Sequence, residues 1–190
     1  MDGPVLMGER VILRPIDLER DVEPWFHAMQ DSRLHEWTGN TIPAHRQETY
    51  ELLEKYKKLD IIIAWSILWK ESDQMIGTFW LSVPQEDEKG INFSGDAQRL
   101  DVKWWGKGIV SESRELVYRY AFLVENVDEI QSQAWTGNHR SCRSMERVGF
   151  KLVKIEDVFN PKYQRIMCQS TYRLSKEDWI KNEEKIELSS

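Results

Sequence analysis

The segment of residues 91–124 constrains the fold of this chain more than any other part of the sequence. A strand-like run over 91–103 is followed by Gly106 and Gly108, and an apolar helical pattern begins at Ile109. Glycine permits a tight turn and lets a ligand approach the main chain closely. The first turn of a helix carries N–H groups without helical partners, at the positive end of the helix dipole. The segment therefore predicts a strand–turn–helix unit that can hold a phosphate or pyrophosphate, and a plain turn without a ligand is the alternative.

Hydrophobic periodicity assigns the rest of the chain to strands and helices. Strands are expected over 9–15, 61–69, 75–83, 91–103, 129–135, 150–159 and 166–174, with 61–69 and 75–83 forming a hairpin, and helices over 21–30, 45–59, 109–124, 138–148 and in the charged tail from 175. We expect Asp21 to cap the first helix, Ser94–Asp96 to mark a bulge, and Gly149 to end the helix 138–148. This order predicts a mixed α/β fold with a largely antiparallel first half. We expect one domain, 1–190, with a core of about 8–174 and a tail, 175–190, that ends in disorder.

Charge and residue usage exclude several classes of function. Lys and Arg number 26 against 32 Asp and Glu, which gives a net charge of −6, the wrong sign for a duplex-binding protein. The most apolar stretch, 61–69, is too short to cross a bilayer, and the first residues lack the apolar run of a secretory signal. The two Cys and four His lack the spacing of metal ligands, and the two Cys form no disulfide framework. We therefore expect a cytoplasmic protein that binds no metal, nucleic acid or membrane, and whose acidity favours amine-bearing partners.

A second informative segment runs from Asn138 to Phe150. Asn138 is a natural N-cap, and Ser141 stands in the first turn of the helix that follows. The segment continues through Glu146 to the pair Gly149-Phe150. The capping role accounts for Asn138 but not for the other residues of this segment.

Taken together, the two segments carry a family resemblance. The pieces Trp105-Gly106-Lys107-Gly108, Asn138…Ser141 and Glu146…Phe150 resemble, in this order, the Gcn5-related N-acetyltransferases (GNAT). Within that superfamily the chain is most similar to the branch of ribosomal-protein N-terminal (Rim-type) acetyltransferases. The resemblance extends from the strand Gly8–Pro15 to about Leu174, which is most of the chain. It implies a mixed, mostly antiparallel central sheet with helices on both faces.

The resemblance implies acetyl-CoA as the co-substrate. Lys103, Gly106 and Gly108 fall on the family's phosphate-binding pattern, with Lys103 in place of the usual Gln or Arg. Main-chain N–H groups of the turn and helix start are implied to hold the pyrophosphate; they belong to Gly106, Lys107, Gly108, Ile109 and Val110. The end of the preceding strand, Leu100, Asp101 and Val102, is implied to pair with the pantetheine arm, which Asn138 also contacts.

The resemblance also implies catalytic roles for direct attack of an amine on the thioester. The amine must first lose a proton, the carbonyl oxygen needs N–H donors, and the leaving thiolate benefits from a proton donor. The resemblance implies that the N–H near Val102 donates to the carbonyl oxygen of the thioester. It places Ser141 at the sulfur, since Met145 stands where many members have a Tyr. A first-turn serine with no further role is the alternative for Ser141.

The general base has two candidate sources. Related enzymes often carry a Glu where Gly95 stands, and the adjacent Asp96 would reach the site if a bulge aimed it there. A solvated charge at the end of a strand is the alternative for Asp96. The loop of His35, Glu36 and Trp37 occupies the place where the family closes over the acceptor. We therefore expect this loop to bind the acceptor, with His35 or Glu36 as the alternative base.

The sequence leaves the acceptor open between two kinds of amine. A protein or peptide α-amine fits the Rim-type resemblance, and a small cationic amine, such as a polyamine or aminoglycoside, fits the acidic charge. A CoA-binding sensor module without turnover is a further alternative, because the usual Tyr is missing. Trp37 and Trp104 are candidates for an acceptor pocket or for the contact of a homodimer.

Overall fold

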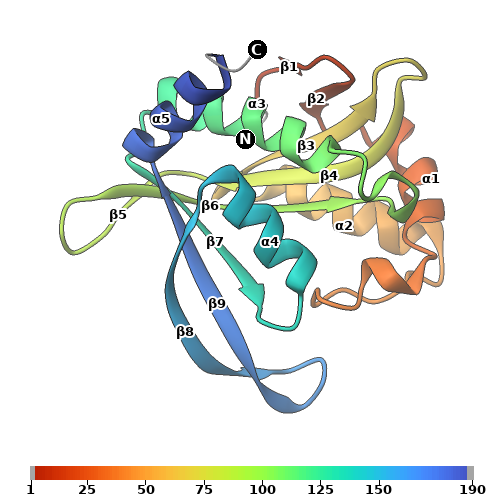
Figure 1. Ribbon diagram of the computed structural model, residues 1–190. Helices are drawn as coiled ribbons and strands as arrows, with labels where there is room; N and C mark the ends of the chain where they lie inside the picture. The colour runs from red at the N-terminus through yellow and green to blue at the C-terminus, as the bar shows by residue number, and fades with distance from the viewer. Residues whose placement is uncertain (1–2, 188–190) are drawn as a thin grey trace. The chain divides into compact units, whose positions relative to one another are not determined.

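The computed structural model describes residues 3–187, which alternate between strands and helices (Figure 1). The strands are β1 (Leu6–Met7), β2 (Val11–Pro15), β3 (Ile62–Trp69), β4 (Gln74–Ser82), β5 (Gln85–Glu86), β6 (Asn92–Leu100), β7 (Glu129–Trp135), β8 (Lys151–Asn160) and β9 (Arg165–Ser175). The α-helices are α1 (Leu18–Ala28), α2 (Arg46–Lys58), α3 (Ile109–Leu123), α4 (His139–Val148) and α5 (Lys176–Glu187), and the 3-10 turns are η1 (Ser32–Leu34) and η2 (Val102–Trp104). The predicted mixed α/β class is confirmed.

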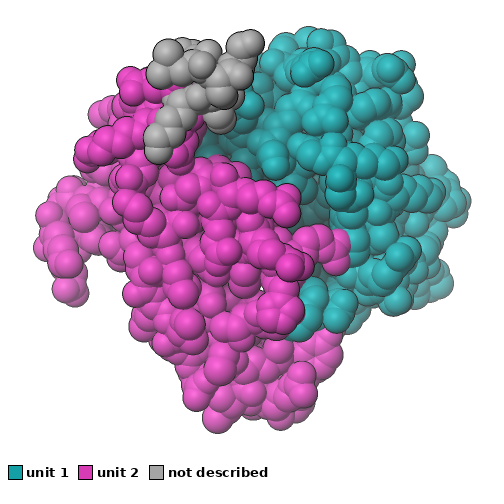
Figure 2. Space-filling model, viewed as in Figure 1, with its two compact units in different colours: residues 1–83, 96–119 teal, residues 84–95, 120–190 magenta. Residues whose placement is uncertain are grey.

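The chain divides into two compact units, which Figure 2 colours separately. Unit 1 consists of residues 1–83 and 96–119, and unit 2 of residues 84–95 and 120–190. Both β6 and α3 contribute residues to each unit. The single domain expected from the sequence stays a prediction.

Unit 1 is built on antiparallel strands in the hydrogen-bonded order β1-β2-β3-β4-β6. Helices α1 and α2 cover one face, where Trp25 and Leu53 lie at the centre of an apolar core. Helix α3 covers the other face. Asp96 of β6 contacts Tyr118 of α3, whereas Arg99, on the opposite side of the same strand, contacts Trp25 of α1. Helices on both faces of the sheet were predicted, and unit 1 confirms them.

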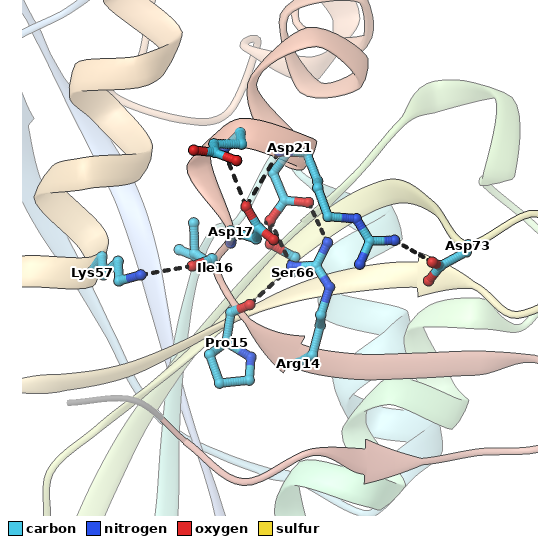
Figure 3. A network of polar contacts seen from close by, with 10 residues as sticks. Arg14, Pro15, Ile16, Asp17, Asp21, Lys57, Ser66 and Asp73 are labelled. Atoms are coloured by element: carbon cyan, nitrogen blue, oxygen red, sulfur yellow. Dashed lines mark hydrogen bonds and ion pairs between the residues drawn. The ribbon is translucent and has the colours of Figure 1, made fainter.

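A buried polar network fixes α1 to the sheet of unit 1 (Figure 3). Asp21 is fully buried and accepts hydrogen bonds from Arg14 at 2.6 and 2.9 Å and from the Ser66 hydroxyl at 2.5 Å. The N-cap is Asp17, whose side chain accepts from two N–H groups of the first turn. The predicted cap at Asp21 is therefore wrong. The helix begins earlier, at Leu18, because Asp17 already has the extended backbone and the acceptor that a cap requires.

Unit 2 is built on the strand order β6-β7-β9-β8, with β5 beside β6. β6 and β7 run parallel, and the other pairs are antiparallel. Helix α4 stops at Gly149, whose φ of +100° favours glycine, so the predicted stop is confirmed. Helix α5 confirms the predicted helical tail, and its Trp179 stacks on Phe122 at 5.2 Å. The predicted disordered end falls on 188–190, outside the described residues.

Strand β6 ends earlier than predicted. It ends at Leu100 rather than at residue 103, because Asp101 accepts a hydrogen bond from the N–H of Lys103 at 3.1 Å and starts η2. The bulge expected at Ser94–Asp96 stays a prediction. On one edge of β6 the pairing with β7 ends at Gly95, and on the other edge the register shifts by one residue between Phe93, which pairs with Gln85, and Asp96, which pairs with Leu81.

The predicted hairpin of residues 61–83 is confirmed by β3 and β4, whose turn places Asp73 at φ +54°. The short elements β1, η1 and β5 were not predicted, since two or three residues carry no periodicity to read. Within residues 3–187, no helix combines the length and the apolar character that a membrane span requires.

Candidate functional site

The glycine turn of unit 1 has the geometry that its sequence predicts. Gly106 and Gly108 both adopt φ +76°, a conformation that L side chains rarely adopt. A Cβ atom added to Gly106 would meet no heavy atom within 4 Å, so the chain is open on that side. Residues 106–108 are exposed. The turn therefore requires glycine for its backbone and presents main chain to a ligand.

The start of α3 adds unpaired donors to this turn. The N–H of Glu112 donates to the carbonyl of Gly108 at 3.1 Å, so the N–H groups of residues 109–111 have no partner inside the helix. These donors lie at the positive end of a helix of 15 residues. Such an end binds a phosphate through several N–H groups at once.

Two residues that the sequence analysis missed fix this turn to β2. Arg10 donates from Nη1 to the Lys107 carbonyl at 2.9 Å and from Nε to Glu112 Oε2 at 2.8 Å. Glu112 also accepts from the N–H groups of Arg10 at 2.7 Å and Val11 at 3.2 Å. These hydrogen bonds of Arg10 and Glu112 hold the first turn of α3 against the sheet. Glu112 is an acidic residue in the first turn of a predicted helix, which the sequence shows. Its partner Arg10 lies 102 residues away along the chain, so the sequence did not indicate the contact.

The turn η2 positions the backbone of Val102. The N–H of Asp101 donates to Ile76 at 2.8 Å, and those of Lys103 and Trp104 donate to Asp101 at 3.1 and 2.9 Å. Within the described part of the chain, these bonds leave the N–H of Val102 without an assigned acceptor. The predicted donor to a carbonyl oxygen is therefore compatible with the local hydrogen bonding.

Asp96 lies in a buried polar cluster beneath α3. Its carboxylate accepts a hydrogen bond from the Tyr118 hydroxyl at 2.7 Å, and its Oδ2 lies 3.8 Å from Nε of Arg114. The side chains of Asp96 and Arg114 are 0% and 1% exposed. Burial raises the pKa of Tyr118 well above its ordinary value, so the phenol stays protonated and donates to the carboxylate. The base role of Asp96 stays a prediction, and these contacts favour a structural role over it.

The face of β6 under α1 and α2 carries Arg99, which the sequence analysis did not single out. The side chain is only 9% exposed, and its guanidinium lies 5.5 Å from the ring centroid of Trp25. Nη2 donates to the Tyr56 hydroxyl at 3.3 Å. Burial lowers the pKa of Arg99 below its ordinary value.

The predicted acceptor loop follows α1 in unit 1. His35 is buried, with its Nε2 2.7 Å from the carbonyl of Met29, whereas Glu36 is exposed and Trp37 half-buried. The carbonyl contact engages one ring nitrogen of His35 and holds the loop to the end of α1. Leu34, next to His35, belongs to the apolar core against which Val102 packs.

Unit 2 carries the remaining predicted residues on α4. Asn138 caps this helix, with its side-chain oxygen accepting from the N–H of Ser141 at 3.2 Å. Ser141 is half-buried, and Cys142 and Met145 behind it are buried. The predicted cap is confirmed, and Met145 belongs to the core of this unit. This hydrogen bond engages the side-chain oxygen of Asn138, so the side-chain nitrogen takes no part in the cap.

The predicted site residues are thus distributed over both units. Residues 96–110 and the loop 35–37 belong to unit 1, and Asn138 and Ser141 belong to unit 2. Among residues 3–187, no group of three or more His, Cys, Asp or Glu side chains could hold a metal ion.

Comparison with known proteins gives a consistent result. A family model described as "Acetyltransferase (GNAT) domain" matches residues 10–151. The curated protein "Uncharacterized N-acetyltransferase p20" of Bacillus licheniformis is 23% identical over 149 residues, which are 77% of this chain and 82% of that protein.

Solved structures share the fold. A GCN5-related N-acetyltransferase from Brucella melitensis aligns with a TM-score of 0.81 and 19% identity, over 93% of this chain and 80% of that one. The microcin C7 self-immunity acetyltransferase MccE, solved in complex with acetyl-CoA and AMP, aligns with a TM-score of 0.76 and 13% identity, over 88% and 93% of the two chains. These likenesses concern the fold alone.

Proposed function

Because this chain belongs to the acetyltransferase (GNAT) domain family, we propose that it transfers the acetyl group of acetyl-CoA to a primary amine by direct attack. We further propose a protein or peptide α-amine as the acceptor, as in the Rim-type branch. The open glycine turn at the start of α3 is the observation that carries the proposal. A left-handed Gly106 with free space at its Cβ, followed by helical N–H groups without helical partners, fits a pyrophosphate.

Each residue has a defined task in this proposal. Acetyl-CoA supplies an activated acyl group, a thioester. The main-chain N–H groups of Gly106–Val110 bind its pyrophosphate, and Leu100 and Asp101 align its pantetheine arm. The N–H of Val102 donates to the thioester carbonyl oxygen and so favours attack at the carbon. The loop 35–37 covers the acceptor amine.

Ser141 is proposed to donate its hydroxyl to the sulfur of the departing thiol. We expect Ser141→Ala to lower kcat by roughly 10–100-fold while KM for acetyl-CoA stays nearly constant, because the contact matters most as the thiolate forms. Steady-state release of free thiol measures both constants. Ser144→Ala, a half-buried serine on the same helix, is the control. If the two variants had the same kcat, Ser141 would be a serine of the first helical turn with no role in catalysis.

Asn138 is proposed to serve both as the cap of α4 and as a contact of pantetheine. Asp caps a helix as well as Asn does, so we expect Asn138→Asp to change the free energy of unfolding by less than about 0.5 kcal/mol. The same change removes the amide N–H donor, and acetyl-CoA affinity should fall about tenfold. Calorimetric titration and urea unfolding measure the two effects. Unchanged affinity would restrict Asn138 to its role as a cap.

The function is tested by incubating the protein with acetyl-CoA and a panel of N-terminal peptides, polyamines and aminoglycosides. We expect thiol release above background hydrolysis and an acetyl mass increment on peptides. Acetylation of small cationic amines alone, which the net charge of −6 favours, would replace the peptide acceptor. Cofactor binding without any transfer would instead support a CoA-binding sensor. A cytoplasmic location and a homodimer stay predictions.

A further inference from the structure

Strand β8 forms one edge of the sheet of unit 2. It is the last strand in the hydrogen-bonded order, and among residues 3–187 it pairs with β9 alone (Figure 1). Its ten residues include four large apolar side chains that are 48–57% exposed: Leu152, Val153, Ile155 and Phe159. A long exposed edge with apolar side chains is a template for a further strand. Such an edge is explained by a partner strand or by a device that blocks one.

The main-chain groups of alternate β8 residues point to this edge. The carbonyl of Cys168 in β9 accepts a hydrogen bond from the N–H of Thr136 at 2.9 Å, so the main chain of Cys168 faces the β7 side. In an antiparallel pair, opposite residues alternate between hydrogen-bonded and non-hydrogen-bonded positions. Asp157 lies opposite Cys168 and therefore directs its own N–H and C=O away from β9. The same alternation applies to Ile155 and Phe159.

A bulge limits how far another strand can pair along this edge. The pairing of β8 with β9 shifts between Leu152 and Lys154, so Val153 is the extra residue. A regular strand edge is available from Lys154 to the end of β8. Bulges and charged side chains are the usual devices that keep an edge from pairing at random. Here they leave a short segment with a defined pattern of charge, which Lys154, Glu156 and Asp157 provide.

This segment is complementary to itself about one axis. Two identical antiparallel strands are related by a two-fold axis, and residues opposite each other share a face of the sheet, so the axis passes through a residue position. An axis at Lys154, Glu156 or Asp157 places like charges opposite each other. An axis at Ile155 instead places Lys154 of each copy opposite Glu156 of the other. It also brings the outward N–H and C=O of Ile155 opposite the same groups of the second copy, which form a reciprocal pair of hydrogen bonds.

We propose that two copies of this chain form a symmetric dimer in which β8 pairs with β8 of the second copy about an axis at Ile155. The sheet of unit 2 then continues from one copy into the other, and Ile155 packs beside its counterpart. The contact comprises about five residues on each strand, fewer than the roughly 20–30 residues a side of a standard interface, so we expect a weak dimer. The contact lies in unit 2, whereas Trp37 and Trp104, the candidates from the sequence, belong to unit 1.

Charge reversal at the two paired positions tests this geometry. Lys154→Glu or Glu156→Lys places like charges opposite each other twice in each dimer, so we expect either change to raise the dissociation constant by roughly tenfold or more. An equimolar mixture of the two variants restores both pairs of opposite charge, and we expect a heterodimer nearly as stable as the wild-type dimer. Sedimentation equilibrium of each variant and of the mixture measures these constants. Lys89→Glu, an exposed lysine of unit 2 outside β8, makes the same change in net charge and should dimerise like the wild type.

Two further results separate this edge from other surfaces. Ile155→Pro removes an N–H that β9 does not use, so the variant should keep the circular dichroism of the wild type and lose the dimer. A dimer that survives Ile155→Pro or both charge reversals, or a mixture that does not associate, would overturn the proposal. So would a wild-type protein that stays monomeric between roughly 1 µM and 1 mM. Growth beyond a dimer would indicate head-to-tail pairing of β8 with the opposite edge, β1, and would overturn it as well.

Discussion

Replacing Gly106 by alanine is expected to weaken acetyl-CoA binding by roughly 10–100-fold, the loss of one or two close main-chain contacts. The added Cβ meets no protein atom within 4 Å, so it occupies the space from which a pyrophosphate would approach the N–H groups of the turn. Holding alanine at φ +76° also costs the backbone about 1–2 kcal/mol. Calorimetric titration with acetyl-CoA measures the affinity.

Gly90→Ala provides a matched control for this change. Gly90 has φ +78°, and its added Cβ would meet nothing closer than 3.6 Å, so the backbone cost is the same. It lies outside the proposed binding segment. If the two variants bound acetyl-CoA equally well, the effect of Gly106→Ala would reflect stability alone and the turn would be a plain one.

Replacing Asp96 by asparagine is expected to lower the free energy of unfolding by about 3–5 kcal/mol. Asparagine can still accept from Tyr118, but it removes the negative charge that lies 3.8 Å from the Arg114 guanidinium, whose side chain is 1% exposed. For a chain of this size, the melting temperature should fall by roughly 6–20 °C. Urea and thermal unfolding measure the change.

The double variant Asp96→Leu with Arg114→Met is the comparison for Asp96→Asn, because it removes both members of the pair. Replacing both members of a buried pair by apolar residues is often nearly neutral, so most of the lost stability should return. If both variants kept wild-type stability, the pair would contribute nothing to α3 packing. Measured on the stable double variant, a kcat loss above roughly 100-fold would assign Asp96 the base role that its sequence position suggested.

Local signals in the sequence predicted the parts of the site that depend on local chemistry. Gly106 and Gly108 indicated the turn because a positive φ selects glycine, and Asn138 indicated the start of α4 because a cap needs a short acceptor. Gly149 indicated the end of α4, again because a positive φ selects glycine. These features depend on a few consecutive residues, so a single sequence displays them.

Features that depend on distant residues were missed or assigned wrongly. Asp21 was assigned as a cap because it stands near a helix start, yet its partners Arg14 and Ser66 come from two strands. The burial of Arg99 depends on α1 and α2 packing over β6, which no local pattern indicates.

The central claim is that the N–H groups of the glycine turn and of the first turn of α3 hold the pyrophosphate of acetyl-CoA. A crystal structure of this protein with CoA tests it most directly. We predict pyrophosphate oxygens within about 3.2 Å of several main-chain nitrogens of residues 106–110. A pyrophosphate bound elsewhere, with these nitrogens turned away from the ligand, would contradict the account.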